Sequence, residues 1–194
     1  MDFSRQPLTY REALDRARDL CGRSEKCCYE MELKCREWWL SPDETSKLTA
    51  SLVKDKFIDQ QRYANSFVND KFRFNKWGRI KLAYTLRQKK IEEKYIREAL
   101  SRLPENTYHQ VLKDLLTAKA KSIKETDPYT RRGKLLAFAQ SRGFEVDLTL
   151  KIIEGMWKLG NVEMWKWTAR IEDLLLRRNN NFRKDSHEFL IIFQ

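Results

Sequence analysis

Positive charge is concentrated in one stretch of the chain, residues 71–90, which contains eight Lys or Arg and no Asp or Glu. Side chains of this type bind anions, such as phosphate groups or acidic protein surfaces. Residues 54–102 carry a net charge of +8, most of the total of +11, whereas residues 1–53 carry −1. The segment therefore predicts a surface for a negatively charged partner, and the alternative is a solvated helix face.

Groups suited to catalysis are scarce. The two histidines, His109 and His187, lie in no catalytic or metal-binding motif. The sequence also lacks the glycine-rich phosphate loop, the GxGxxG dinucleotide pattern, the HExxH zinc pattern and the GxSxG nucleophile pattern. We therefore expect a protein that is not an enzyme and that needs no cofactor of its own.

Four cysteines near the N-terminus could form a zinc or redox site. They are Cys21, Cys27, Cys28 and Cys35, and we expect them in one helical stretch. Tetrahedral zinc sites usually pair their ligands two to four residues apart, and here there is neither a CxxC pair nor a nearby His. The pattern instead favours small, buried, reduced thiols, so no metal site is predicted.

The composition indicates a helical fold. Six Gly and four Pro in 194 residues leave room for few turns, and a hydrophobic fraction of 41% is enough for a core. No apolar run approaches the roughly 18 residues that a membrane span needs. The N-terminal residues show no apolar signal region, so we expect a cytoplasmic protein without a membrane segment.

Several helix starts can be identified from capping residues. Ser41, with Pro42 after it and Glu44 three residues on, forms a capping box. Asp59 is an N-cap for the next helix, and Ser24 is expected to cap an earlier one. Further helices are expected from about Glu105 to Ile123, from Pro128 to Arg142, and from near Val146.

One pattern occurs three times. Trp39-Leu40, Lys90-Ile91 and Gly143-Phe144 each follow an amphipathic basic helix and precede a short capped helix, at offsets of 51 and 53 residues. This spacing predicts an all-α fold of tandem, degenerate three-helix repeats that form an elongated, curved array. The predicted units are residues 1–50, the basic residues 51–103, residues 104–154, and a C-terminal extension of unknown role at 155–194.

The central segment resembles a known family. The run Ile58-Asp59-Gln60-Gln61-Arg62-Tyr63-Ala64 with Phe67-Val68, followed by Lys76-Trp77-Gly78-Arg79-Ile80 and Lys90-Ile91, is similar to the motif of RecX, a bacterial regulator of the recombinase RecA. The resemblance covers about residues 8–154. The matching positions, which we interpret as mostly structural, are Asp59, Arg62, Tyr63, Ala64, Phe67, Gly78 and Ile91.

The resemblance implies a non-enzymatic regulator of recombination, DNA repair and the SOS response that binds the RecA–DNA filament and inhibits or destabilises it. It also implies weak, non-specific binding to single- and double-stranded DNA, and a monomer is expected. The alternative is a general DNA-binding helical protein that acts through phosphate contacts. The expected contacts are Arg73, Lys76, Arg79, Lys81, Arg87, Lys89 and Lys90, and in a second set Lys119, Lys121, Lys124, Arg131, Arg132 and Lys134.

The C-terminal extension has no counterpart in this resemblance. An amphipathic helix is expected over Asn161–Arg178, and the last apolar run is Phe189–Phe193. A docking element, a natural extension and a segment without a selected role all remain open interpretations.

Overall fold

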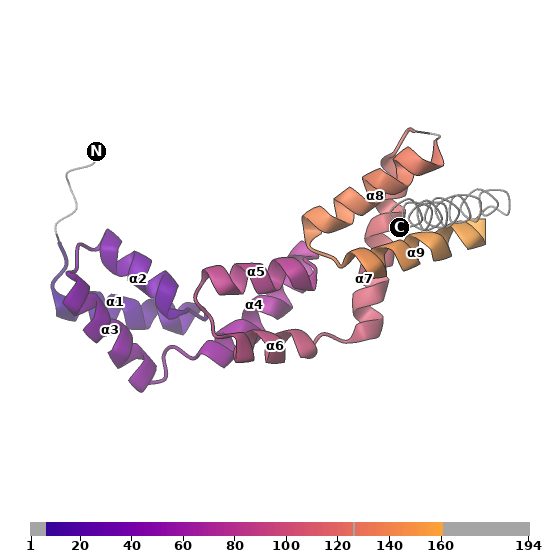
Figure 1. The fold of residues 1–194 in the computed structure, drawn as a ribbon. Helices are drawn as coiled ribbons and strands as arrows, with labels where there is room; N and C mark the ends of the chain where they lie inside the picture. Colours follow the sequence, from indigo (N-terminus) through magenta and orange to yellow (C-terminus); the bar gives the residue numbers. More distant parts are fainter. Residues whose placement is uncertain (1–6, 126, 161–194) are drawn as a thin grey trace, which may run out of the picture. The chain divides into compact units, whose positions relative to one another are not determined.

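The computed structural model describes residues 7–125 and 127–160, and these form nine α-helices without a β-strand among them (Figure 1). The predicted all-α class is therefore confirmed, and the expected helix over Asn161–Arg178 lies outside the described residues. No helix in the described part is long and apolar enough to cross a membrane. The helices are α1 (Tyr10–Arg23), α2 (Cys28–Glu37), α3 (Pro42–Lys54), α4 (Gln60–Asn75), α5 (Arg79–Gln88), α6 (Glu93–Ser101), α7 (Glu105–Ser122), α8 (Pro128–Arg142) and α9 (Val146–Gly160).

Helix starts follow the capping chemistry of the sequence. Ser41 and Glu44 form the predicted capping box at α3, and the Asp59 carboxylate accepts a hydrogen bond of 2.7 Å from the Arg62 backbone N–H at α4. A second capping box, Thr9 with Glu12, opens α1 and was not identified from the sequence. Each cap satisfies a backbone donor that the first helical turn leaves without an intrahelical partner.

Two expectations for the N-terminal region were wrong. Ser24 does not cap α2, because its extended backbone ends α1 and its N–H bonds to the Leu20 carbonyl. The cysteines do not share one helix, since Cys21 lies in α1 whereas Cys28 and Cys35 lie in α2. The thiols are free, and no cluster of three or more metal-ligating side chains occurs among the described residues.

The middle helix of each triplet ends in the same backbone motif. Trp39, Lys90 and Gly143 adopt left-handed φ angles of 64°, 58° and 83°. Each N–H bonds to the carbonyl three residues earlier, and the next N–H bonds to the carbonyl five residues earlier, at 3.1 Å in all three cases. This is the Schellman arrangement, and the residue that follows is buried each time, as Leu40, Ile91 or Phe144. The predicted repeat is therefore visible in the backbone.

The chain divides into two compact units. Among the described residues, the first comprises those up to Leu112 together with Ala139–Glu145, and the second comprises those of Lys113–Phe138 and Val146–Gly160. In the first unit, α1 and α2 pack on α3, while α4 and α5 pack on α6. The predicted domain boundaries after residues 50 and 154 fall inside α3 and α9, and the one after 103 falls between α6 and α7. Treating each triplet as a domain remains a prediction.

Backbone atoms from distant parts of the first unit meet at the start of α5. The Gly78 N–H donates to the Arg142 carbonyl at 2.9 Å, and the Ile80 N–H donates to the Gly143 carbonyl at 3.0 Å. A Cβ added at Gly78 would lie 2.2 Å from the Gly143 oxygen, and one added at Gly143 would lie 2.3 Å from the Lys81 Cβ. Both positions therefore require glycine.

Replacing Gly143 by Ala should lower the free energy of unfolding by about 2–5 kcal/mol, because left-handed strain and a backbone clash add together. Chemical denaturation followed by circular dichroism would measure this loss. Gly133→Ala is the matched control: this glycine lies within α8 with no atom near its Cβ position, so the change should stabilise by up to about 1 kcal/mol. Equal changes in the free energy of unfolding for the two substitutions would contradict the close approach of Gly143 to Lys81.

Candidate functional site

The first set of predicted contact residues is largely engaged inside the protein. Four of the seven form ion pairs, while Lys81 donates to the Ser141 carbonyl at 3.3 Å. Arg73 is exposed, and Lys76 is half-buried in a left-handed conformation at the end of α4. The ion pairs are Arg79–Glu105 at 2.7 Å, Arg87–Glu93 at 2.7 Å, Lys89–Glu30 at 2.6 Å and Lys90–Glu32 at 3.4 Å.

The second set lies in the second unit, and half of it is also engaged. Arg132 pairs with Glu154 at 3.3 Å, and Lys134 pairs with Glu125. The remaining contacts of this set are Arg131 to the Ala120 carbonyl at 2.9 Å and the Lys119 ammonium at 5.6 Å from the Phe138 ring, while Lys121 and Lys124 are exposed. Whether either set contacts a partner remains a prediction.

Lysines and aromatic rings gather where α4 and α5 meet. The Lys81 ammonium lies 4.7 Å and the Lys71 ammonium 5.7 Å from the centroid of the Trp77 ring. Phe67 packs against Trp77 with its ring at 66° and a centroid distance of 6.4 Å, and it stacks on Tyr63. We call Tyr63, Phe67, Lys71, Trp77, Lys81 and Lys89 the lysine–aromatic cluster. Each exposed contact of an ammonium with a ring stabilises by about 0.5–1 kcal/mol.

Lys71 was not among the residues singled out from the sequence. The signal for it was nevertheless present, because Lys71 follows Phe67 by four residues and Lys81 follows Trp77 by four. Within α4 this spacing places the Lys71 ammonium over the preceding Phe67 ring, whereas Trp77 lies before the N-cap of α5 and contacts Lys81 from outside the helix. The structure also shows that Lys71 and Lys81 both contact the Trp77 ring, which a count of charges along the sequence could not show.

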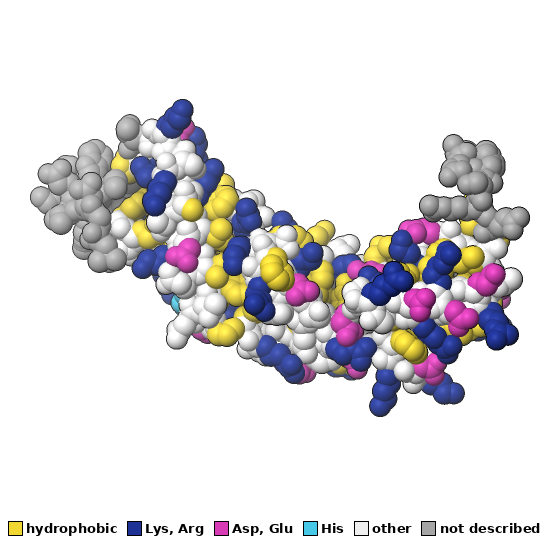
Figure 2. All heavy atoms as spheres, turned by 180° about the vertical axis from the view of Figure 1, so that it is seen from behind, with side chains coloured by type: hydrophobic (Ala, Val, Ile, Leu, Met, Phe, Trp, Pro, Cys, Tyr) yellow, Lys and Arg dark blue, Asp and Glu magenta, His cyan; other side chains and the backbone are white. Residues whose placement is uncertain are grey.

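A pocket of about 470 Å³ opens beside the cluster. Its lining comes from α4, from the second half and C-cap of α5, from Trp77 before α5, and from the α1–α2 connection with the first turn of α2; it includes Lys26, Ser66, Asp70 and Lys71. The volume lies within the roughly 300–1,000 Å³ that is usual for sites of small ligands. On the face drawn in Figure 2, Lys and Arg side chains lie among exposed hydrophobic ones.

Glu30 joins the first three helices to the next three. Its carboxylate accepts hydrogen bonds from the Tyr63 hydroxyl at 2.9 Å and from the Lys89 ammonium at 2.6 Å. Burial raises the pKa of Glu30, but these hydrogen bonds outweigh burial and hold the pKa below the ordinary 4.5. Arg62 makes a parallel link, with its Nε 2.6 Å from Glu25. These contacts give Arg62 and Tyr63 structural roles.

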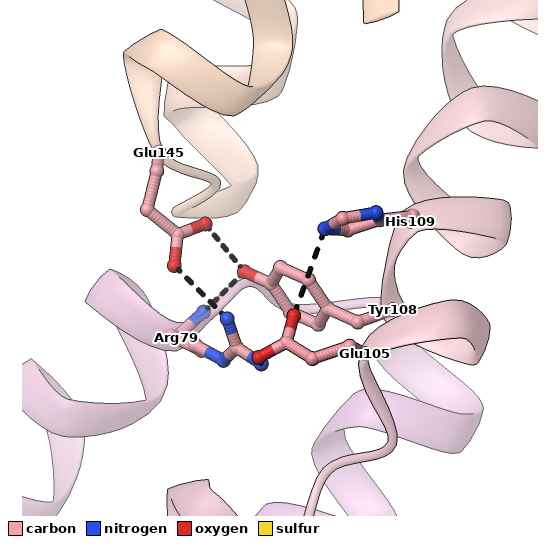
Figure 3. Close-up of polar contacts among 5 residues, drawn as sticks. All are labelled: Arg79, Glu105, Tyr108, His109 and Glu145. Carbon is pink, nitrogen blue, oxygen red and sulfur yellow. Dashed lines mark hydrogen bonds and ion pairs between the residues drawn. The ribbon is translucent and has the colours of Figure 1, made fainter.

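A second polar group surrounds Tyr108, as Figure 3 shows. This buried hydroxyl accepts from the Arg79 backbone N–H at 2.9 Å and donates to the Glu145 carboxylate at 2.7 Å. The Arg79 guanidinium lies 4.2 Å from the Tyr108 ring centroid and pairs with Glu105. Burial raises the pKa of Tyr108, so the hydroxyl stays protonated at neutral pH. Arg79 therefore has a structural role. His109 is exposed at the edge of this polar group.

Three helix triplets, each with a middle helix that ends in the same backbone motif, define a helical-repeat protein. Residues 59–100 match the family model described as RecX, second three-helix domain. The chain is 32% identical over 135 residues to a protein named Regulatory protein RecX from Chlorobium phaeobacteroides, a match that covers 70% of this chain and 87% of the relative. The chain belongs to the RecX family.

Other relatives agree with this assignment. Proteins of the same name from Clostridium beijerinckii and Clostridium acetobutylicum are 34% and 29% identical, over 63% and 70% of this chain. The matches span 57% and 64% of those relatives. A crystal structure of regulatory protein RecX aligns with a TM-score of 0.68 at 20% identity, covering 75% of this chain and 71% of that one. The crystal structure of RecX from Lactobacillus salivarius aligns with a TM-score of 0.66 at 18% identity. That alignment covers 75% of this chain and 95% of the other. These structures share the fold.

The contacts of Glu30 with Tyr63 and Lys89, which we call the Glu30 joint, should make the stability of the protein depend on pH. A carboxyl whose pKa is lowered by folding contributes stability above its ordinary pKa and loses it as the pH falls through the folded value. Glu30→Gln should therefore destabilise by about 1–3 kcal/mol at pH 7. The gap from the unmodified protein should close as the pH falls well below 4.5. Urea unfolding of both proteins at pH 7 and well below pH 4.5 measures this difference in the free energy of unfolding. A difference that does not change with pH would contradict the role of the Glu30 carboxylate.

Proposed function

We propose that this protein is a non-enzymatic regulator of RecA-mediated recombination and DNA repair, which binds the RecA–DNA filament and inhibits or destabilises it. Membership of the RecX family is the observation that carries the proposal, because the relatives that match this chain are named as regulatory proteins. The protein acts in the cytoplasm as a monomer and without a cofactor. Its partner is the filament, and it contacts single- or double-stranded DNA weakly and without sequence preference.

Charge supports an anionic partner. Several lysines and arginines of the basic segment make no ion pair among the described residues, so their charge is available to acidic protein surface or to phosphate. These residues are Lys71, Arg73, Lys76 and Lys81. The engaged residues Arg79, Arg87 and Lys89 instead hold helices together, and their removal would act on the fold first.

A general DNA-binding protein is the second candidate, and the aromatic rings beside Lys71 and Lys81 favour it. Phosphate contacts release counterions, so pure DNA binding weakens steeply with salt, by about 0.7–0.9 units of log affinity per contact for each tenfold rise in salt. Binding to a filament retains a protein–protein component at high salt.

The first experiment is ATP hydrolysis by the cognate RecA on single-stranded DNA, with this protein titrated in at near-physiological salt. We expect the rate to fall at protein concentrations well below that of RecA, because a regulator that caps or disassembles a filament acts on many subunits. If the rate falls only when the protein coats the DNA, competition for phosphates explains the effect and the regulator proposal fails.

Removing two cluster charges should weaken this inhibition. In the Lys71→Gln/Lys81→Gln variant the partner loses two ammonium contacts, and we expect a rise of about two- to thirtyfold in the concentration for half-inhibition, since each such contact contributes about 0.2–1 kcal/mol. Lys47→Gln/Lys54→Gln removes the same charge from exposed sites on α3 and serves as the control. Equal inhibition by both variants would show that only net charge matters.

A further inference from the structure

We propose that the pocket beside the lysine–aromatic cluster binds one nucleotide of a single-stranded nucleic acid, with the base stacked on Trp77 and the phosphate held by Lys71 and Lys26. This inference deepens the proposed function and rests on it, because a recombinase filament is built on a single strand. Neither the charge count nor the family match points to this pocket. The contacts around the pocket point to it.

The pocket has an excess of uncommitted positive charge. Of its three lining carboxylates, Glu25 pairs with Arg62 and Glu30 bonds to Lys89 and Tyr63, while Asp70 is exposed. In the described chain, neither Lys26 nor Lys71 forms an ion pair, and both residues line the same pocket. An anion that enters the pocket therefore meets two lysines whose charge is not neutralised.

Trp77 favours a nucleotide over an acidic peptide. The indole is half-buried: Phe67 packs against its ring at an interplanar angle of 66°, and the Lys71 and Lys81 ammonium groups lie over it. A base stacked on an aromatic ring stabilises more than an exposed ammonium on the same face, so a base can displace the lysine. The displaced ammonium then lies within reach of the adjoining phosphate. A carboxylate side chain offers charge but no surface to stack on the ring.

The size and form of the pocket indicate a single strand. About 470 Å³ accommodates one nucleotide, and a base can enter only where it is not paired and stacked within a duplex. Asp70 lies at the rim as an exposed carboxylate and repels the phosphate. Its charge keeps the affinity moderate, and it also offers a substitution that should strengthen binding.

The test is fluorescence anisotropy of a short labelled oligothymidylate with the full chain, without recombinase. Trp77→Leu should weaken binding by about five- to a hundredfold through lost stacking, and Trp77→Phe should restore most of the affinity. Tyr129→Leu, an exposed aromatic of α8 outside the pocket, is the control and should bind as the unmodified protein does. A Trp77→Leu variant with native helical content and unchanged affinity would overturn the proposal.

The salt dependence separates the stacking contact from the phosphate contact. Lys71→Gln should reduce the slope of log affinity against log salt by about 0.7, whereas Trp77→Leu should leave the slope unchanged. Asp70→Asn should strengthen binding. An unchanged slope in Lys71→Gln, or an oligoglutamate peptide that binds with the same dependence on Trp77, would overturn the nucleotide assignment.

Failure of this pocket can be told from failure of the regulator proposal. Oligonucleotide binding that depends on Trp77, in a protein that does not inhibit RecA, supports the pocket and overturns the regulator. Inhibition of RecA by a protein whose oligonucleotide binding does not depend on Trp77 supports the regulator proposal and overturns the nucleotide pocket.

Discussion

The close approach of two glycines at the start of α5 is the constraint on which the first unit depends. No side chain caps this helix, since Gly78 occupies the N-cap position. Its first N–H groups are satisfied by the Arg142 and Gly143 carbonyls and by the Tyr108 hydroxyl. A helix start left without such partners would cost several unmade hydrogen bonds. Trp77 directly precedes Gly78, and its indole forms one wall of the pocket. The position of this wall therefore follows from backbone contacts with Gly143, which lies 65 residues after Gly78.

The basic segment serves two purposes that a charge count cannot separate. Lys89 and Arg79 hold helices together: Lys89 bonds to Glu30 of α2, and Arg79 bonds to Glu105 at the start of α7. Lys71 and Lys81 contact aromatic rings instead and leave their charge without a carboxylate partner in the part of the chain that is described. The folded protein therefore uses part of its excess charge for its own cohesion and presents the remainder to a partner.

Local chemistry made part of this structure predictable. The caps at Ser41 and Asp59 act within one helical turn, so the sequence alone identified them, and the three equivalent turns were found from their spacing. Ser24 shows the limit, because Ser can end a helix as well as begin one, and tertiary packing decides between the two. The Glu30 joint and the approach of Gly78 to Gly143 connect residues far apart in sequence, and no local pattern encodes such pairs.

The three left-handed turns have one more implication. The turn at Gly143 meets the preceding triplet through its backbone, and the turn at Lys90 meets it through a side chain that reaches Glu32 and Tyr29. Trp39 occupies the same position in the first triplet, at a backbone geometry that costs a non-glycine residue about 1–2 kcal/mol, and its side chain is 72% exposed. In the described chain, the turn that in the two later triplets contacts the preceding triplet therefore carries an exposed indole in α1–α3.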